Sequence, residues 1–250
     1  MNVLEVQNLY KGFGGVQAVA GVSFAVAEGE LLALIGPNGA GKSTCFNMLN
    51  GQLRPDSGSV QLRGQEISGL PPRAVSRLGV GRTFQITATF GSMTVAENVQ
   101  TALLSHRGGM KGLWRPAATL YRDEAMALLA RVGMTEQADR ACGVLAYGDL
   151  KRVELAVALA NDPGLLLMDE PTAGMAPGER VELMALTAGI TRERGIAVLF
   201  TEHDMDVVFA HADRIIVLNR GDLIAEGPPD AVRADARVRE LYLGESLEAD

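Results

Sequence analysis

Apolar and polar residues along the chain predict short strands followed by helices. Near the N-terminus apolar and polar positions alternate over 3–9 and 22–27, and a continuous apolar run follows at 31–36. Alternation predicts strands with one exposed face, whereas the continuous run predicts a strand buried on both faces. A glycine-rich turn then leads into a predicted helix that stops at Gly51.

Beyond residue 50 the same patterns predict a second series of elements. Residues 94–160 differ, because Ala and Leu recur there at helical spacing. The expected elements outside that region are a strand at 59–64, a helix at 71–77 opened by proline, a strand at 165–169, a helix at about 178–193, a strand at 196–200, a helix from about 204, and a strand at 214–218 that continues through a hairpin at Arg220 and Gly221.

Strands that alternate with helices predict an α/β fold with a mostly parallel sheet covered on both faces. We expect one domain over residues 1–250. Within it, residues 1–93 and 161–250 are expected to form the α/β core, and residues 94–160 an inserted helical subdomain.

Composition narrows the classes of protein. The net charge of -7 and the pI near 5.1 oppose a general nucleic-acid-binding role. Apolar runs such as 31–35 and 165–168 are far shorter than the roughly 20 residues that a membrane span requires, and the N-terminus has no secretory pattern. Cys45 and Cys142 stand apart without a CxxC pair, which favours a reducing compartment. We therefore expect a cytoplasmic protein.

The strongest chemical signal is GPNGAGKST at residues 36–44, between an apolar strand and a helix. It satisfies the phosphate-binding pattern G-x-x-x-x-G-K-[ST] in the context that this pattern requires. Glycines let the backbone turn its N–H groups toward a polyphosphate, and the helix adds its positive end. Lys42 is expected to reach the terminal phosphates, Ser43 to ligate Mg²⁺, and Thr44 to add a phosphate contact. The expected nucleotide-binding residues are Gly36, Pro37, Asn38, Gly39, Ala40, Gly41, Lys42, Ser43 and Thr44.

Two further segments place polar residues after apolar strands. Asp169 and Glu170 follow the run at 165–168, so they are expected at the carboxyl edge of the sheet, where α/β folds bind ligands. There Asp169 suits Mg²⁺, and Glu170 suits the polarisation of an attacking water. His203 follows the strand at 196–200 and falls along the same edge, within reach of a γ-phosphate. Taken alone, Glu170 could instead cap a turn, and His203 could be an ordinary loop residue.

The order of these motifs resembles the ATP-binding subunit of ABC transporters over essentially the whole chain. GPNGAGKST, TFQ, LAYGD, LLLMDEP, AGMAP and the histidine follow one another as in that family. The resemblance implies a P-loop ATPase core with an added antiparallel β subdomain, and ATP and Mg²⁺ as ligands. It also implies that Phe13 stacks on adenine, with Tyr10 as the competing aromatic, and that Gln85 reaches the metal or the attacking water.

The segment LAYGD departs from the LSGGQ usual in the family, where it caps the ATP of the opposite subunit. Its residues Ala146, Tyr147, Gly148 and Asp149 are expected to contact that nucleotide, with Gly148 and the helix after it still presenting backbone N–H groups. Loss of the Ser hydroxyl costs on the order of 1.5–3 kcal/mol if nothing replaces its hydrogen bond to phosphate. Ala176 likewise stands where the family usually has Asp. Both departures concern action on a partner's site, so they favour a heterodimer over a homodimer.

One subgroup carries LAYG-type signatures in pairs of different ATPases, namely importers for branched-chain and other hydrophobic amino acids. The long segment 103–125, which contains Trp114, and the ending VRELYLGE are similar to that subgroup. The resemblance implies membrane-spanning permease subunits, an indirect link to a substrate-binding protein, and a place on the inner face of the cell membrane. A lipid or lipopolysaccharide exporter ATPase, a soluble ABC ATPase outside transport, and a regulator that does not hydrolyse ATP are the alternatives. Arg73, Arg77 and Arg82 form either a solvated face or a contact with the membrane partner.

Overall fold

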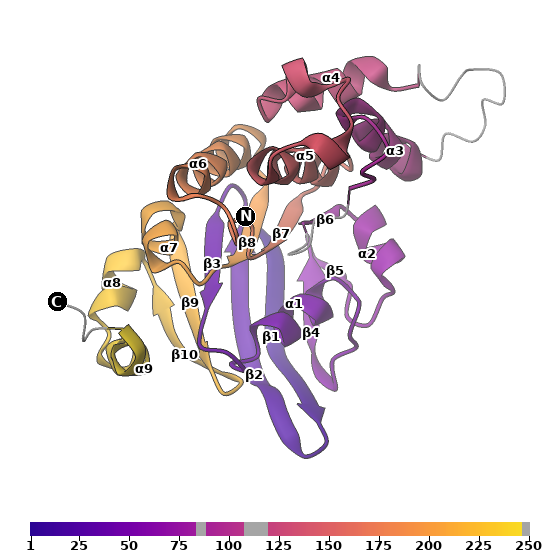
Figure 1. Ribbon diagram of the computed structural model, residues 1–250. Helices are drawn as coiled ribbons and strands as arrows, with labels where there is room; N and C mark the ends of the chain where they lie inside the picture. The colour runs from indigo at the N-terminus through magenta and orange to yellow at the C-terminus, as the bar shows by residue number, and fades with distance from the viewer. Residues whose placement is uncertain (84–88, 108–119, 247–250) are drawn as a thin grey trace.

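A computed structural model describes residues 1–83, 89–107 and 120–246 of the chain. This part contains two sheets and a layer of helices (Figure 1). Its strands are β1 (Asn2–Phe13), β2 (Val16–Ala27), β3 (Leu31–Ile35), β4 (Ser57–Leu62), β5 (Gln65–Glu66), β6 (Val80–Thr83), β7 (Leu165–Asp169), β8 (Ala197–Thr201), β9 (Arg214–Asn219) and β10 (Asp222–Gly227). Its α-helices are α1 (Lys42–Leu49), α2 (Pro72–Arg77), α3 (Val95–Arg107), α4 (Arg122–Arg131), α5 (Tyr147–Leu159), α6 (Pro177–Arg194), α7 (Met205–His211), α8 (Pro229–Ala234) and α9 (Ala236–Ser246).

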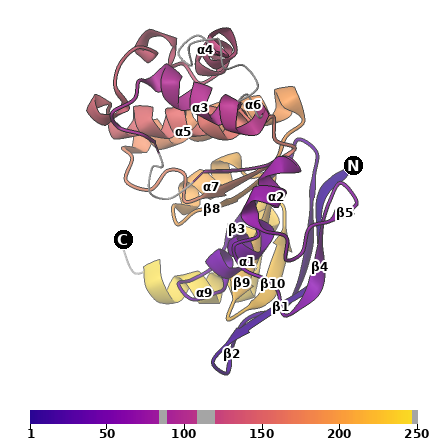
Figure 2. The same ribbon diagram turned by 90° about the vertical axis from the view of Figure 1, so that its right-hand side faces the viewer.

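The first sheet is antiparallel, with the strand order β2-β1-β4-β5. β1 and β2 are each 12 residues long, so the predicted strands at 3–9 and 22–27 are too short. The additional residues form the end of a hairpin that projects away from the helices in both views (Figure 2), where Lys11 pairs with Val19 and Phe13 with Val16. The hairpin end is largely exposed, so its side chains carry no core-facing alternation that the sequence could reveal.

The second sheet has six strands in the order β10-β9-β3-β8-β7-β6. The pairs from β9 to β6 are all parallel, whereas β10 is antiparallel to β9. Alternate residues of β3 enter two different cores: Leu32 and Leu34 join the core toward the antiparallel sheet, and Leu31 joins the core toward α3, α5 and α6. Burial on both faces explains why β3 reads as an unbroken apolar run.

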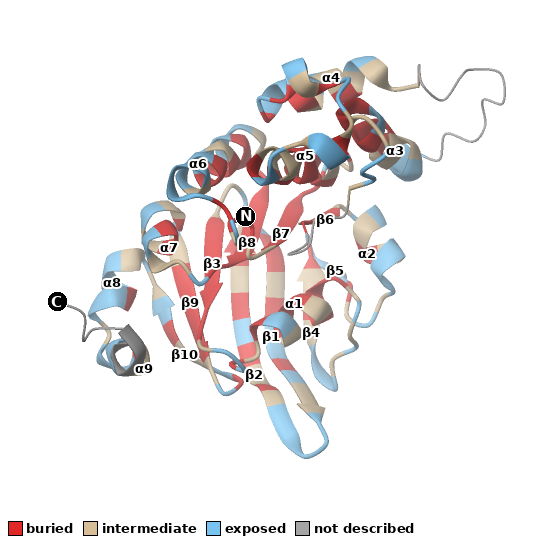
Figure 3. Ribbon diagram, viewed as in Figure 1, coloured by how far each residue is buried: buried red, intermediate tan, exposed pale blue. Residues whose placement is uncertain are grey.

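The helices α3, α4 and α5 lie together at one end of the molecule, beyond the six-stranded sheet (Figure 2). All three fall within residues 94–160, where the sequence predicts helices, and their apolar residues share one core with the sheet (Figure 3). The division into a core and a helical subdomain stays a prediction. Among the described residues, no helix has both the length and the apolar character that crossing a bilayer demands.

Parallel pairing brings the carboxyl ends of β3, β7 and β8 to one edge of the sheet. Leu34 pairs with Thr201, and Asp169 pairs with the same Thr201 from the other side. The loops that follow these three strands begin at Gly36, Glu170 and Glu202. Three segments that are far apart in sequence therefore meet at this edge, which is where ligands bind in open α/β sheets.

Candidate functional site

A cavity of about 320 Å³ opens at this edge of the sheet. The loops after β3, β7 and β8 contribute to it, together with the end of the β1–β2 hairpin. Its lining residues are Phe13, Ala18, Asn38, Gly39, Ala40, Gly41, Lys42, Ser43, Thr44, Glu170 and His203. The structure thus brings together residues from four segments that the sequence singles out separately.

The loop from Gly36 to Gly41 wraps tightly because its glycines adopt conformations that other residues avoid. Gly41 caps α1 with a φ of 105°, and a Cβ atom there would overlap the carbonyl oxygen of Ala18. Gly36 is equally constrained, since a Cβ atom would overlap the carbonyl oxygen of Leu218. The turn after β9 supports the loop from outside, where the Gly221 N–H donates to the Ala40 carbonyl at 3.0 Å. Lys42, Ser43 and Thr44 are the first residues of α1 and all line the cavity, so the positive end of the helix lies beside it.

Lys42 is the buried cation of the cavity. Its Nζ donates to the carbonyl oxygens of Gly36 at 2.6 Å and of Pro37 at 3.1 Å. Burial lowers the pKa of Lys42, while the carboxylates of Glu170 and Asp169 act in the opposite direction. A cation held beside a helix N-terminus makes this end of the cavity suited to a polyphosphate.

Glu170 and His203 face each other across the cavity mouth. Glu170 Oε1 lies 2.8 Å from His203 Nε2, and the imidazole is half exposed. Glu170 holds a left-handed backbone conformation with a φ of 48°, which costs about 1–2 kcal/mol for a residue other than glycine. Its N–H donates to the Thr201 carbonyl at 3.1 Å, which helps to hold that conformation. Residues with strained backbone conformations are frequent at functional sites, where the position of a side chain matters more than the stability of the fold.

Asp169 lies next to Glu170 and is held from two sides. Its Oδ1 accepts a hydrogen bond from Thr201 Oγ1 at 2.9 Å, and its Oδ2 lies 3.6 Å from Nη2 of Arg82. A carboxylate at Asp169 and a hydroxyl at Ser43 are both hard oxygen donors, which Mg²⁺ prefers, and Mg²⁺ takes few protein ligands beside phosphate. These two residues therefore fit the expected metal. The third expected ligand, Gln85, lies outside the described residues.

The hairpin supplies the aromatic wall of the cavity. Phe13 ends β1 and remains 49% exposed although it lines the cavity, so its ring is available to a ligand. The competing aromatic, Tyr10, does not line the cavity; its hydroxyl lies against Gly21 on β2. Position therefore favours Phe13 for stacking on a base.

The segment from Ala146 to Asp149 does not line this cavity. Ala146 is the N-cap of α5, so the helix begins at Tyr147 and includes Gly148, whereas the sequence predicted a helix that begins after Gly148. The N-cap residue itself makes no side-chain hydrogen bond to the first turn, because Ala146 has no hydroxyl to accept one. The Tyr147 ring packs against Gly174 in the loop after β7. Within one chain, the segment and the cavity are thus separate features.

Of the two alternatives for the arginines, the solvated face is wrong for Arg82, and the contact with a membrane partner stays a prediction. Arg73 and Arg77 are exposed on α2, but Arg82 lies on β6, a strand that the sequence analysis misses. Its Nη1 donates to Gln52 Oε1 at 2.6 Å, and burial lowers its pKa although Asp169 opposes the shift. A four-residue strand without clear periodicity explains the omission.

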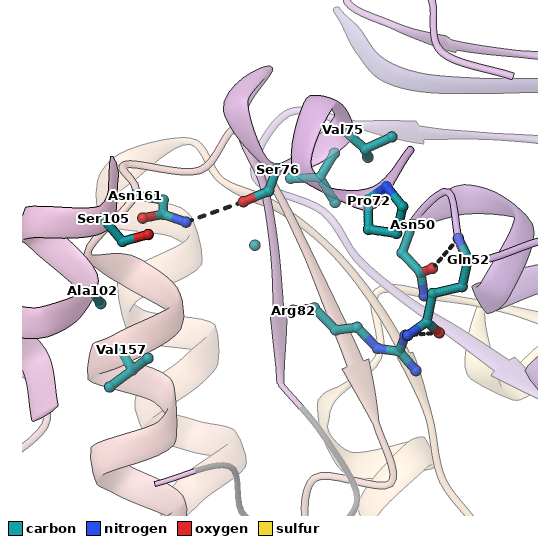
Figure 4. A pocket seen from close by; sticks show the side chains of 12 residues that line it. Asn50, Gln52, Pro72, Val75, Ser76, Arg82, Ala102, Ser105, Val157 and Asn161 are labelled. Carbon is teal, nitrogen blue, oxygen red and sulfur yellow. Dashed lines mark hydrogen bonds between the residues drawn. The ribbon is translucent and has the colours of Figure 1, made fainter. Parts of the chain in front are cut away.

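A second cavity of about 310 Å³ lies beside Arg82, between α2 and the helices α3 and α5 (Figure 4). Val75 and Val157 line it with apolar side chains, and Asn50 lines it with a polar amide. Asn50 is 6% exposed, and its Nδ2 atom has no hydrogen-bond partner in the part of the chain that the structure describes. This groove, as we call it, was not predicted from the sequence.

Comparisons with known proteins agree with the geometry. The family model described as ABC transporter matches residues 19–173, and the one described as branched-chain amino acid ATP-binding cassette transporter matches residues 223–248. The high-affinity branched-chain amino acid transport ATP-binding protein BraF of Pseudomonas aeruginosa is 42% identical over 251 residues, covering 98% of each chain.

Solved structures show the same architecture. The ADP conformation of an ATP-binding cassette of an ABC transporter superposes with a TM-score of 0.87 at 33% identity, covering 98% of this chain and all of the other. A cassette solved as a dimer in a post-hydrolysis state with ADP and phosphate has a TM-score of 0.76 at 26% identity, covering 90% of this chain and 98% of the other. The phosphate-binding loop, the carboxylates and the histidine thus occur in a chain that belongs to the ABC transporter family of ATP-binding subunits.

Proposed function

We propose that this chain hydrolyses MgATP to drive an importer for branched-chain or other hydrophobic amino acids. The observation that carries the proposal is the single cavity in which the phosphate-binding loop, Glu170 and His203 meet. The cargo class is supported by the similarity to BraF and by the match over residues 223–248. Exporter ATPases and soluble ABC ATPases share the core motifs, but the C-terminal match favours the importer.

In the proposed mechanism the chain orients a polyphosphate and a water. Backbone N–H groups of the loop and Lys42 bind the β- and γ-phosphates. Glu170 orients or deprotonates the attacking water, and His203 hydrogen-bonds the γ-phosphate. Ser43 and Asp169, with Gln85, would hold Mg²⁺, which when bound neutralises charge on the phosphates. Phe13 stacks on adenine and so places the triphosphate in the loop.

We propose that a second ATPase subunit completes the site. Ala146, Tyr147, Gly148 and Asp149 do not line the cavity of their own chain, and a related cassette has been solved as a dimer. The N-terminus of α5 would then face the γ-phosphate of the partner's nucleotide. Because Ala146 has no hydroxyl, the contact that this chain offers to the partner's γ-phosphate is weak. This weakness favours a different subunit as partner. With ATP, the Glu170→Gln chain should dimerise only after that second ATPase is added; dimers of this chain alone would contradict the proposed heterodimer.

We propose that the groove beside Arg82 receives a segment of the membrane-spanning partner. An apolar wall beside an Asn50 Nδ2 atom that has no hydrogen-bond partner among the described residues suits a helix end that presents a backbone carbonyl. Docking there would hold the chain at the cytoplasmic face of the membrane. Ser105 lines the groove and is exposed, so Ser105→Trp should abolish transport while hydrolysis by the free chain persists. The matched control is Ser57→Trp on the antiparallel sheet, and equal transport by both variants would exclude docking in the groove.

Uptake by reconstituted vesicles tests the proposed function. The chain is combined with its second ATPase, its membrane subunits and the binding protein, and ATP-driven accumulation of labelled leucine is compared with that of labelled glutamate. The proposal predicts uptake of leucine and little uptake of glutamate. ATP hydrolysis without uptake of any hydrophobic amino acid would refute the cargo class and leave the ATPase assignment standing.

A further inference from the structure

Glu202, the residue before His203, is a buried carboxylate next to the nucleotide cavity. It is 4% exposed, and charged side chains are seldom buried so deeply unless they are fully paired. Its Oε1 accepts hydrogen bonds from the Thr172 N–H at 2.8 Å and from Thr172 Oγ1 at 2.7 Å. Its Oε2 accepts from the His203 N–H at 3.2 Å. Three donors therefore converge on one carboxylate.

These hydrogen bonds join two loops that carry the reacting groups. Thr172 lies two residues after Glu170 in the loop after β7, and His203 is the second residue of the loop after β8. The side chains of Glu170 and His203 meet at 2.8 Å on the cavity side, and Glu202 joins the same two loops from the buried side. Glu202, which does not itself line the cavity, thus links the two loops that carry Glu170 and His203.

A second link between the loops lies farther out. Arg180 Nη1 donates to Asp204 Oδ2 at 2.6 Å, and Arg180 Nε donates to the Met175 carbonyl at 2.8 Å. This link is partly exposed, so it contributes less than a buried pair. It nevertheless holds the far end of the β7 loop. The end nearest Glu170 is held by the Glu170 N–H, which donates to Thr201 at the end of β8, and by Glu202 through Thr172.

We infer that Glu202 is a positioning residue of the ATPase site, which fixes His203 and Glu170 at their mutual distance through Thr172. The inference rests on the proposed roles of Glu170 and His203. Hydrolysis requires a water, a carboxylate and a phosphate-binding group in one geometry, and small displacements of such groups reduce turnover strongly. Binding of ATP depends mainly on the loop from Gly36 to Thr44 and should be insensitive to Glu202.

Conservative variants distinguish a loss of positioning at the site from a general defect in folding. In Glu202→Gln the amide oxygen still accepts from Thr172, but the amide nitrogen faces the His203 N–H, so two donors oppose each other. In Thr172→Val the hydroxyl donor is lost and the N–H donor is kept, whereas Thr172→Ser keeps both. Glu193→Gln is the matched control, because that carboxylate is exposed on α6 and pairs only with Arg131 among the described contacts.

The experiment measures kcat and KM for ATP, together with amide hydrogen exchange in the nucleotide-free chain. We expect Glu202→Gln to lower kcat by about tenfold or more with KM changed by less than about threefold. Thr172→Val should lower kcat less, Thr172→Ser should restore it, and Glu193→Gln should match the wild type. Exchange at the His203 amide should accelerate in Glu202→Gln without any nucleotide present.

Three results would count against the inference. An unchanged kcat in Glu202→Gln overturns it, as does a parallel loss of ATP affinity or a Thr172→Ser variant as impaired as Thr172→Val. The Glu170→Gln variant, measured alongside, distinguishes this failure from failure of the proposed function. If Glu170→Gln turns over like the wild type, the assigned role of Glu170 is wrong irrespective of Glu202.

Discussion

Ala146 offers a direct test of the uncapped helix at the altered signature. It is the N-cap of α5 with extended backbone angles (φ -63°, ψ 155°), it is exposed, and no side chain there accepts from the first turn. A serine in this conformation accepts a hydrogen bond from an N–H of the first turn. Ala146→Ser is therefore expected to stabilise the chain by about 0.5–2 kcal/mol.

For a chain of 250 residues, each kcal/mol added to the free energy of unfolding raises Tm by about 2–4 °C. An N-cap hydrogen bond of typical strength should therefore raise Tm by about that amount. The assay is thermal unfolding of the purified chain beside Ala127→Ser. Ala127 is exposed in the middle of α4, where serine is a poorer helix former than alanine, so this control should lose up to about 0.7 kcal/mol.

The same variant tests the role of the segment in the dimer. If α5 caps the nucleotide of the second ATPase subunit, the new hydroxyl adds a hydrogen bond to phosphate worth about 1.5–3 kcal/mol, and hydrolysis by the two subunits together should rise. A Tm that falls in parallel with that of Ala127→Ser would refute the reading of Ala146 as an uncapped N-cap position. A raised Tm with unchanged hydrolysis would confirm the hydrogen bond at the N-cap of α5. It would count against a contact between the new hydroxyl and the phosphate.

Two further variants probe the loop and the acid stability. Gly41→Ala should abolish nucleotide binding, because the φ of 105° and the Ala18 carbonyl both exclude a Cβ atom. Titration with a fluorescent ATP analogue measures the binding, and tight binding by the variant would contradict that geometry. For Asp204, burial tends to raise the pKa, but hydrogen bonds from Arg180 and the Val207 N–H hold it below the ordinary 3.8. The stability that ionised Asp204 contributes is thus present above about pH 4 and is lost as the pH falls through its folded-state pKa. The Tm of Asp204→Asn should therefore fall less on acidification than the Tm of the wild type. Identical acid profiles would exclude that contribution.

The parallel core was predictable because its strands are buried on both faces and read as unbroken apolar runs. The cavity was predictable too, because the loop from Gly36, Glu170 and His203 come after such strands, and parallel strands end at one edge. β6 and the long hairpin were missed, since short or exposed strands leave no periodic signal. Gln85 and Trp114 lie outside the described residues, so the expectations for them remain predictions.

Thr201 and Glu202 were missed for a different reason. Both stand at the end of β8 beside His203, and a polar run directly after a buried strand was the available signal. Their partners, Asp169 and Thr172, are about 30 residues away in sequence, so only the register of β7 against β8 brings them together. Sequence patterns locate residues on elements, whereas hydrogen bonds between loops depend on tertiary structure.

The most direct test of the account is the fate of ATP bound to Glu170→Gln. The variant keeps the shape of the side chain and removes the charge that orients the water, so MgATP should bind but remain uncleaved. Nucleotide recovered from the protein after prolonged incubation is separated by chromatography, with Glu193→Gln as the control. The account predicts bound ATP in Glu170→Gln and ADP in the control. Conversion to ADP at the same rate in both would show that Glu170 does not act in hydrolysis, and the proposed mechanism would be wrong.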